Sequence, residues 1–285
     1  MVRSFFAISL LFSFRAYSAF GAFFGFAGFY LSPKLRKIAL KNLSNAFPEY
    51  GTGRIYDIAR ACFVNQGRNL FELFTFYSLD AEKISSLISF PDRANLDEAL
   101  KRGRGVLYVT AHFGNWELMG AGLSIMGYPI NVIARKIYLE HLNDLLVKLR
   151  NKVGMKVILR SDESSARDIL KALKNNEVIG VLIDQDTSVK GVFVDFFGKS
   201  AYTTSGLAAI ALRSSATVVG GFLIRQKGRH LLRVSHPVEL KITGDKNTDI
   251  LVNTQMFTKM VEDIIREYPE QWVWMHRRWK TKKDD

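Results

Sequence analysis

The chain has 285 residues, enough for one large α/β domain or two smaller ones, and its hydrophobic fraction of 48% excludes a polytopic membrane protein. Lys and Arg number 40 against 27 Asp and Glu, and the net charge of +13 indicates an anionic partner such as an acidic membrane surface, an acidic protein or a nucleic acid. The single cysteine, Cys62, excludes an intrachain disulfide and any CxxC metal motif, and its apolar neighbours predict a small core residue.

Residues 4–31 form an apolar stretch in which Arg15 is the single charge. As a helix this stretch would be roughly 42 Å long, which exceeds a bilayer core of about 30 Å. The next segment is basic, with cations at Lys34, Arg36, Lys37 and Lys41. This flank disfavours a cleaved signal peptide and, by the positive-inside rule, places residues 34 onward in the cytoplasm. We therefore predict a hydrophobic membrane anchor over residues 1–32, with two amphipathic pieces lying in the interface as the alternative because Arg15 is central.

After the anchor the pattern is first helical and then changes. Apolar side chains recur at helical spacing over residues 34–47 and 54–76, which predicts a helical subregion over residues 33–100. From residue 101, short apolar runs alternate with amphipathic helices. The runs cover residues 106–109, 130–134, 156–159, 178–183 and 217–224, and the helical patterns cover residues 116–126, 139–153, 163–175, 203–213 and 248–267. Residues 230–235 and 238–242 resemble late, antiparallel strands.

This alternation predicts the fold class. Continuous apolar strands joined by helices are typical of an α/β fold with a mostly parallel central sheet and helices on both faces. No Pro/Gly-rich linker interrupts residues 33–285, so the helical subregion and the α/β core over residues 101–285 are expected to form one domain.

The stretch VLYVTAHFGNWEL, residues 106–118, carries the residues most indicative of chemistry. Gly114 and Asn115 supply a turn and a cap for a helix that begins near Trp116. His112 therefore lies at the carboxyl end of a parallel strand, where open α/β sheets bind their ligands. Glu117 follows in the first helical turn, and we expect its carboxylate to contact one imidazole nitrogen and leave the other free as a general base.

Two aspartates offer the imidazole a different partner. Asp184 and Asp186 end the strand 178–183 and could face the same cleft, and of the two Asp186 is the preferred alternative to Glu117. The ordinary interpretation is that both are turn residues before a loop over residues 187–200. A metal site is disfavoured, because the remaining histidines form no ligand cluster with His112, and we expect neither a metal nor a cofactor.

The setting AHFGNWE resembles the His-x4-acid motif of the glycerolipid acyltransferases, and the wider pattern resembles the lipid A biosynthesis (lauroyl/myristoyl) acyltransferase family. Three further segments agree with that family in the same order: residues 41–49 (KNLSNAFPE), 194–206 (beginning VDFFG) and 269–278 (PEQWVWMHRR). His-x4-Glu alone is a weak signal, whereas four segments in order are a specific one. The resemblance runs from the anchor to about Lys280.

The resemblance implies a bacterial inner-membrane acyltransferase whose catalytic domain faces the cytoplasm. It implies an acyl-carrier-protein thioester as donor, an anionic glycolipid (a lipid A precursor, through a hydroxyl or hydroxyacyl chain) as acceptor, and His112 with Glu117 as the catalytic pair. Arg135 would meet a sugar phosphate or steady an oxyanion, although it could equally be a surface arginine. The other candidates for substrate binding are Asn115, Arg277 and Arg278.

Three alternatives remain open at this stage. The acceptor could be another anionic lipid, such as a phosphatidylinositol mannoside or a lysophospholipid, with unchanged chemistry. A non-catalytic protein that binds anionic membranes would explain the charge, but it would need no histidine with a spaced acid. Nucleic-acid binding leaves the apolar N-terminal stretch without a role, so we expect no nucleic-acid partner.

Overall fold

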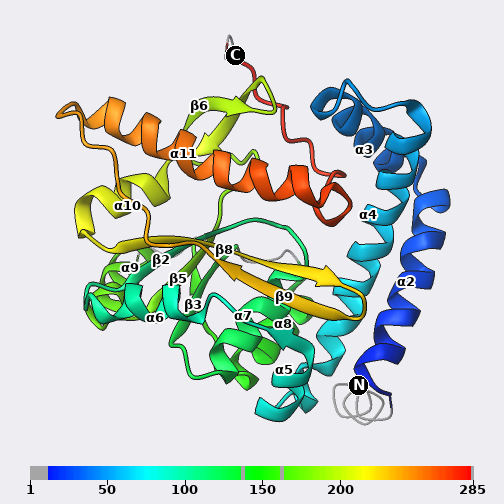
Figure 1. Cartoon of the computed structure of the whole chain (residues 1–285), viewed down its shortest axis with the longest axis horizontal. Helices are drawn as coiled ribbons and strands as arrows, with labels where there is room; N and C mark the ends of the chain where they lie inside the picture. The colour runs from blue at the N-terminus through cyan, green and yellow to red at the C-terminus, as the bar shows by residue number, and fades with distance from the viewer. Residues whose placement is uncertain (1–11, 136–138, 161–163, 284–285) are drawn as a thin grey trace.

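The computed structural model describes residues 12–135, 139–160 and 164–283, and its centre is a seven-stranded sheet with strand order β1-β9-β8-β2-β5-β3-β4 (Figure 1). The strands are β1 (Ile88–Ser89), β2 (Val106–Thr110), β3 (Ile130–Ala134), β4 (Lys156–Leu159), β5 (Val178–Leu182), β8 (Thr217–Gln226) and β9 (Arg229–Val234). All neighbours are parallel except β8 and β9, which are antiparallel. The predicted mostly parallel sheet is therefore confirmed.

Helices cover both faces of this sheet, as predicted. One face packs against α5 (Ala81–Leu87), α6 (Arg93–Lys101), α7 (Trp116–Ile125) and α8 (Glu140–Lys152). The other packs against α9 (Ser165–Lys174), α10 (Gly206–Ser214) and α11 (Lys246–Glu267). Each face has its own hydrophobic cluster, which is why every residue of β2 is buried and why its sequence is continuously apolar.

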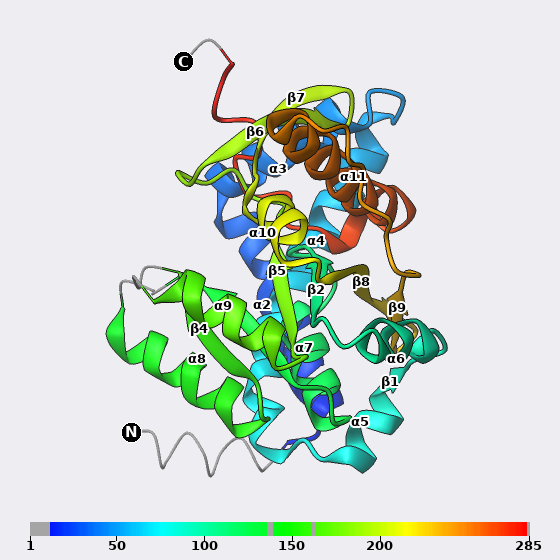
Figure 2. The same cartoon turned by 90° about the vertical axis from the view of Figure 1, so that its left-hand side faces the viewer.

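Two segments differ from the sequence-based prediction. The predicted loop over residues 187–200 and the start of the predicted helix at 203 contain an antiparallel hairpin, β6 (Gly191–Phe196) and β7 (Lys199–Thr204), outside the main sheet (Figure 2). The hairpin packs on α11, where Glu262 accepts a hydrogen bond from the Phe197 N–H at 2.7 Å. The predicted strand 238–242 is reduced to one bridge between Val218 and Val238.

The N-terminal part of the structure is helical: α2 (Phe14–Leu31), α3 (Pro33–Ala46), α4 (Thr52–Glu72) and the 3-10 helix η1 (Leu73–Ser78). Helices α2 and α4 run side by side at the edge of the molecule (Figure 1). Their backbones touch where Gly21 and Gly25 of α2 meet Gly67 of α4, because a Cβ at any of these positions would overlap the backbone of the other helix. Small residues therefore fix α2 against the domain.

None of the helices in the described part of the chain combines the length and the apolar character that crossing a membrane requires. The predicted spanning anchor is thus unsupported, and residues 1–11 of the predicted segment lie outside the described residues. Helix α2 packs on the protein instead. It buries Gly21, Gly25 and Phe29 against its neighbours and exposes several phenylalanines.

The helical subregion shares its core with the sheet. Leu43 of α3 and Cys62 and Phe63 of α4 belong to the same buried cluster as Leu107 and Val109 of β2. Cys62 is fully buried, as predicted for a core residue. The C-terminal segment joins this packing, since Asn42 of α3 donates hydrogen bonds to the carbonyls of Trp274 (2.8 Å) and His276 (2.7 Å).

Candidate active site

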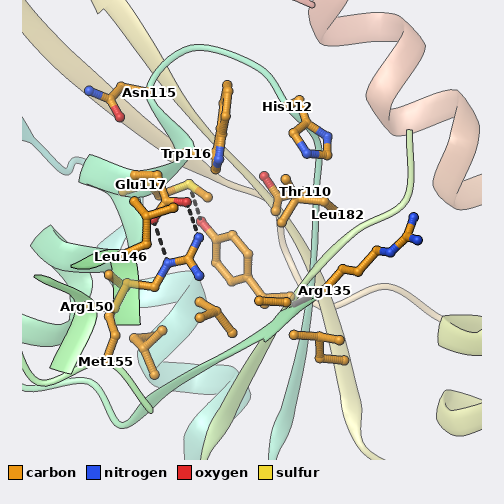
Figure 3. Close-up of a pocket in the computed structure, with 18 of the residues that line it drawn as sticks. Thr110, His112, Asn115, Trp116, Glu117, Arg135, Leu146, Arg150, Met155 and Leu182 are labelled. Carbon is orange, nitrogen blue, oxygen red and sulfur yellow. Dashed lines mark hydrogen bonds and ion pairs between the residues drawn. The ribbon is translucent and has the colours of Figure 1, made fainter. Parts of the chain in front are cut away.

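His112 lies two residues beyond β2, in a short turn that leads into α7 (Figure 3). The turn is tight, because Gly114 has a φ of +55° and a Cβ there would overlap the Leu223 carbonyl. Asn115 caps α7 by accepting a hydrogen bond from the Leu118 N–H at 2.9 Å. The sequence-based prediction of strand, turn and helix is therefore confirmed, and it holds the imidazole at the carboxyl edge of the sheet.

The partner of the imidazole is Asp184. The His112 Nδ1 lies 2.9 Å from Asp184 Oδ1, and the His112 N–H donates to Asp184 Oδ2 at 3.0 Å. The Asp184 side chain is fully buried, whereas 26% of the His112 side chain is exposed. Burial alone would raise the pKa of the Asp184 carboxyl, but the charge and hydrogen bonds of His112 and a hydrogen bond from Trp272 together hold that pKa below its ordinary value.

The expected contact between His112 and Glu117 is wrong. Both carboxylate oxygens of Glu117 accept hydrogen bonds from Arg150 of α8, one of them at 3.0 Å, so Glu117 points toward α8 (Figure 3). The reason is the sheet register. Because β2 and β5 are parallel neighbours with Thr110 opposite Leu182, the residues two positions further on, His112 and Asp184, come together.

Asp186, the preferred alternative from the sequence, has other partners. Its carboxylate accepts hydrogen bonds from the backbone N–H and the hydroxyl of Thr281, both at 2.9 Å. Its backbone N–H donates to His276 Nε2 at 3.2 Å. Asp186 therefore fastens the C-terminal segment to the sheet edge, and the ranking of Asp186 above Asp184 is corrected.

The sequence analysis missed two groups near His112, the Trp272 indole and an ion pair between Glu72 and Arg225. Trp272 is fully buried and its indole N–H donates to Asp184 Oδ2 at 2.8 Å, so this carboxylate is held from three directions. Its place in the PEQWVW segment was noted, but nothing in the sequence indicates this contact.

A buried ion pair lies behind the turn. Glu72 of α4 binds Arg225 of β8 at 2.7 Å and accepts a hydrogen bond from Asn115. Burial raises the pKa of Glu72, but the hydrogen bonds and charge of Arg225 outweigh it, and the pKa lies below its ordinary value. Asn69 also donates to the Gly114 carbonyl. Helix α4 therefore supports the turn that carries His112.

A cavity of about 580 Å³ opens in front of His112 (Figure 3). One part runs between the sheet and helices α7 and α8 and has an apolar lining that includes Tyr108, Met119, Leu123, Ile130, Val132, Met155 and Val178. The other part lies over the carboxyl edge of the strands and is polar, with Arg135, Arg160, Gln185, Thr187 and Thr204. His112, Trp116 and Thr110 also line the cavity.

The predicted substrate-binding residues separate into two groups. Arg135 is exposed and lines the cavity. Asn115 also lines the cavity, but its side chain is buried and already bonded to Glu72 and to Leu118 of α7. Arg277 is exposed outside that lining. Arg278 is fully buried and donates to the Tyr202 carbonyl at 2.6 Å and to Thr203, and burial lowers its pKa to about 10. The expectation that Arg278 binds substrate is therefore corrected, because its side chain is buried and already bonded within the protein.

Among the residues that the structure describes, no group of three or more His, Cys, Asp or Glu side chains is arranged to hold a metal ion.

A family model described as "Bacterial lipid A biosynthesis acyltransferase" matches residues 2–281. The chain belongs to this family. It is therefore an enzyme of the acyltransferase class, and the family supports acyl transfer to a lipid.

Relatives in this family act on different lipids, according to their names. The chain is 27% identical to the lipid A biosynthesis palmitoleoyltransferase of Escherichia coli K12, over 86% of this chain and 78% of that protein. It is 27% identical to the lauroyltransferase of the same organism, over 87% and 80% respectively. It is 25% identical to a phosphatidylinositol mannoside acyltransferase of Mycolicibacterium smegmatis, over 78% and 72%. The names thus agree on the reaction class and differ in the acceptor.

Proposed function

We propose that this acyltransferase moves a fatty acyl group from an acyl-carrier-protein thioester to a hydroxyl of a lipid A precursor, with His112 as general base. The observation that carries the proposal is the pair formed by partly exposed His112 and buried Asp184 at a cavity with an apolar part. A phosphatidylinositol mannoside acceptor is the second candidate, because a named relative uses that lipid.

The geometry supports separate roles for His112 and Asp184 in the reaction. With its proton on Nδ1 shared with Asp184, the His112 ring presents Nε2 as the acceptor of a proton. The lipid hydroxyl oxygen attacks the thioester carbonyl carbon while its proton passes to Nε2. The tetrahedral intermediate then collapses, the C–S bond breaks, and the imidazolium returns the proton to the departing sulfur. Ionised Asp184 stabilises the imidazolium without taking its proton.

The apolar part of the cavity is the proposed place for the acyl chain. It lies beneath the Glu117–Arg150 pair, whose two side chains are 15–16% exposed and whose charges neutralise each other. Gly120 and Gly180 widen this part, since neither has a side chain to occupy the space near Met155 and Val132. Hydrocarbon in such a pocket gains about 0.8 kcal/mol per buried methylene group.

The proposal also includes docking to the inner membrane through α2. One side of this helix exposes Phe20, Phe23, Phe24, Phe26 and Tyr30, which we call the aromatic surface. Exposed cations precede and follow it in the chain, at Arg15, Lys34, Lys37 and Lys41. Aromatic side chains bordered by cations favour the headgroup region of an anionic membrane.

Helix α4 lies between the aromatic surface and the cavity and contacts both. Phe24 stacks on Phe71 of α4 with ring centroids 5.1 Å apart. The residue that precedes Phe71, Leu70, is 56% exposed and lines the cavity. This arrangement supports a proposed approach of the lipid acceptor to His112 along α4 from the membrane side.

Turnover with purified protein, acyl-carrier-protein donor and lipid acceptor in mixed micelles tests the base. His112→Gln and Asp184→Asn should each lower kcat about 100-fold or more. Asp186→Asn is the matched control at the same sheet edge and should keep near wild-type kcat. Lipid A precursor and phosphatidylinositol mannoside are compared as acceptors. Wild-type turnover by His112→Gln would refute the assignment of the base, and wild-type protein inactive on every lipid acceptor would refute the function.

A further inference from the structure

Arg135 and Arg160 follow the ends of two neighbouring strands. Strands β3 and β4 are parallel, and their last paired residues are Ala134 and Leu159. The pairing continues one step further, because the Arg160 N–H donates to the Ala134 carbonyl at 2.9 Å. The two arginines are therefore adjacent across the strands.

Because the pairing continues past the strand ends, we expect the two side chains to leave the same face of the sheet. Residues two positions apart in a strand share a face, and Ile133 and Ile158, two positions earlier, both pack against the same hydrophobic cluster. Arg135 and Arg160 are both exposed, and both line the cavity that His112 lines. In Figure 3, Arg135 lies on the opposite side of the pocket from Arg150.

Among the residues that the structure describes, no side chain compensates the charges of this pair. Within the described ranges, neither guanidinium makes a hydrogen bond or ion pair with another side chain, whereas Arg150 is bound to Glu117. Glu117 is also the sole carboxylate among the described residues of the cavity lining. Like charges opposite each other on neighbouring strands are destabilising, so the arrangement favours an anion between them.

We infer that Arg135 and Arg160 form a binding site for a phosphate group at the polar end of the cavity. Each guanidinium offers a planar fork of N–H donors that matches two phosphate oxygens, and two forks side by side can hold a doubly charged phosphate. Thr187 and Thr204, which also line this end, offer hydroxyl donors. Arg160, which the sequence analysis did not single out, is the new member of the site.

The inference rests on the proposed function for the source of the phosphate. Two reactants of that reaction bring one: the acceptor can carry a phosphate on its sugar, and the donor carries a phosphodiester in its pantetheine arm. The chemistry that the arginines recognise is the same in both, so the source is decided by experiment.

Direct binding tests the site without any turnover. Inorganic phosphate is titrated into the full-length protein in detergent, with the arginine side chains observed by nitrogen NMR. Arg135→Ala and Arg160→Ala should each weaken phosphate binding at least tenfold, and Arg160→Lys should recover part of it. Arg167→Ala is the matched control, because Arg167 is an exposed arginine of α9 outside the cavity lining. Binding that is unchanged in Arg160→Ala would overturn the inference.

Kinetics then identify the source. If the acceptor supplies the phosphate, Arg160→Ala raises KM at least tenfold for the phosphorylated acceptor and leaves KM unchanged for the same acceptor without phosphate. If the donor supplies it, the same contrast appears between acyl-phosphopantetheine and acyl-pantetheine thioesters. Equal effects with and without phosphate in both arms would overturn the inference. Absent wild-type turnover would instead count against the proposed function, while the phosphate titration would still decide the site.

Discussion

At the scale of single residues, two histidines of this enzyme have opposite surroundings. His112 is partly exposed and faces an ionised carboxylate. His230 of β9 is 2% exposed, and neither of its ring nitrogens has a hydrogen-bond partner among the described residues. Burial, followed by the charge of Arg225, lowers the pKa of His230 to about 4. Its ring packs against Phe14 of α2 as an apolar group would.

This burial predicts a pH-dependent stability. The pKa of His230 is about 4 in the folded protein and 6.5 in an unfolded chain, so between these values only the unfolded state binds the proton. Stability is retained at pH 7 and is lost as the pH falls from 6.5 toward 4. Between pH 7 and pH 5, protonation of His230 in the unfolded state should lower the unfolding free energy by about 2 kcal/mol. Urea unfolding followed by tryptophan fluorescence at both pH values measures the loss.

His230→Leu should remove this part of the pH dependence, because leucine fills the same apolar site without a titratable group. His141→Leu, at an exposed position of α8, is the control and should keep the wild-type difference between pH 7 and pH 5. If His230→Leu loses as much stability as the wild type on acidification, the assignment to His230 is wrong.

The sequence could identify His112 at the residue scale, but it could not identify its partner. A histidine at a strand end is visible in a local pattern of strand, turn and helix. Asp184 becomes its neighbour only through the order and register of β2 and β5, which local patterns do not contain. Glu117 is close in sequence, but α7 turns its side chain toward Arg150 of another helix.

At the scale of secondary structure, the contact between α2 and α4 depends on glycine. Gly67 and Gly53 both lie in α4, yet a Cβ at Gly67 would overlap the backbone of α2, while a Cβ at Gly53 would meet no atom within 4 Å. Substitutions at these two positions therefore measure two effects separately: helix–helix packing at Gly67 and intrinsic helix propensity at Gly53.

Gly67→Ala should lower the unfolding free energy by about 1–3 kcal/mol, because the two backbones must move apart. Gly53→Ala should be neutral or stabilise by a few tenths of a kcal/mol, since alanine favours helix more than glycine does. Urea unfolding of the two variants in the same detergent measures the difference. Equal stabilities would show that the close approach of α2 and α4 does not hold in solution.

The elements that the sequence predicted best are the buried strands. Strands β3 and β4 were predicted with their observed bounds, because continuous apolar runs between polar helices have few alternatives. The hairpin β6–β7 was missed because its residues are mixed in polarity and lie outside the main sheet. For α2 the apolar pattern was visible, but a pattern of hydrophobicity does not distinguish a helix inserted in a membrane from one packed on a neighbour through glycines.

At the scale of the whole molecule, the aromatic surface of α2 borders α4, the helix whose Leu70 lines the cavity. Phe23, which is 66% exposed, is part of this surface. Replacement of both Phe23 and Phe26 by serine should weaken binding to vesicles containing phosphatidylglycerol at least tenfold, because each ring contributes about 1.5–3 kcal/mol when it leaves water. Co-sedimentation with vesicles measures this change.

Ile242→Ser is the matched control, because Ile242 is 77% exposed but lies outside the aromatic surface. Added salt should weaken binding of the wild type to the anionic vesicles and have little effect on phosphatidylcholine vesicles, since salt screens exposed cations. Unchanged sedimentation of the double serine variant would contradict docking through α2.

The C-terminal segment contributes to the candidate site through two contacts. The Gln271 carbonyl accepts a hydrogen bond from Gly114, and the Trp272 indole holds Asp184, so residues near the carboxyl terminus complete the surroundings of His112. A protein in which this segment is not packed lacks both contacts. The surroundings of His112 therefore depend on a segment far along the chain, and loss of its packing would disturb the proposed base without any change in β2 or α7.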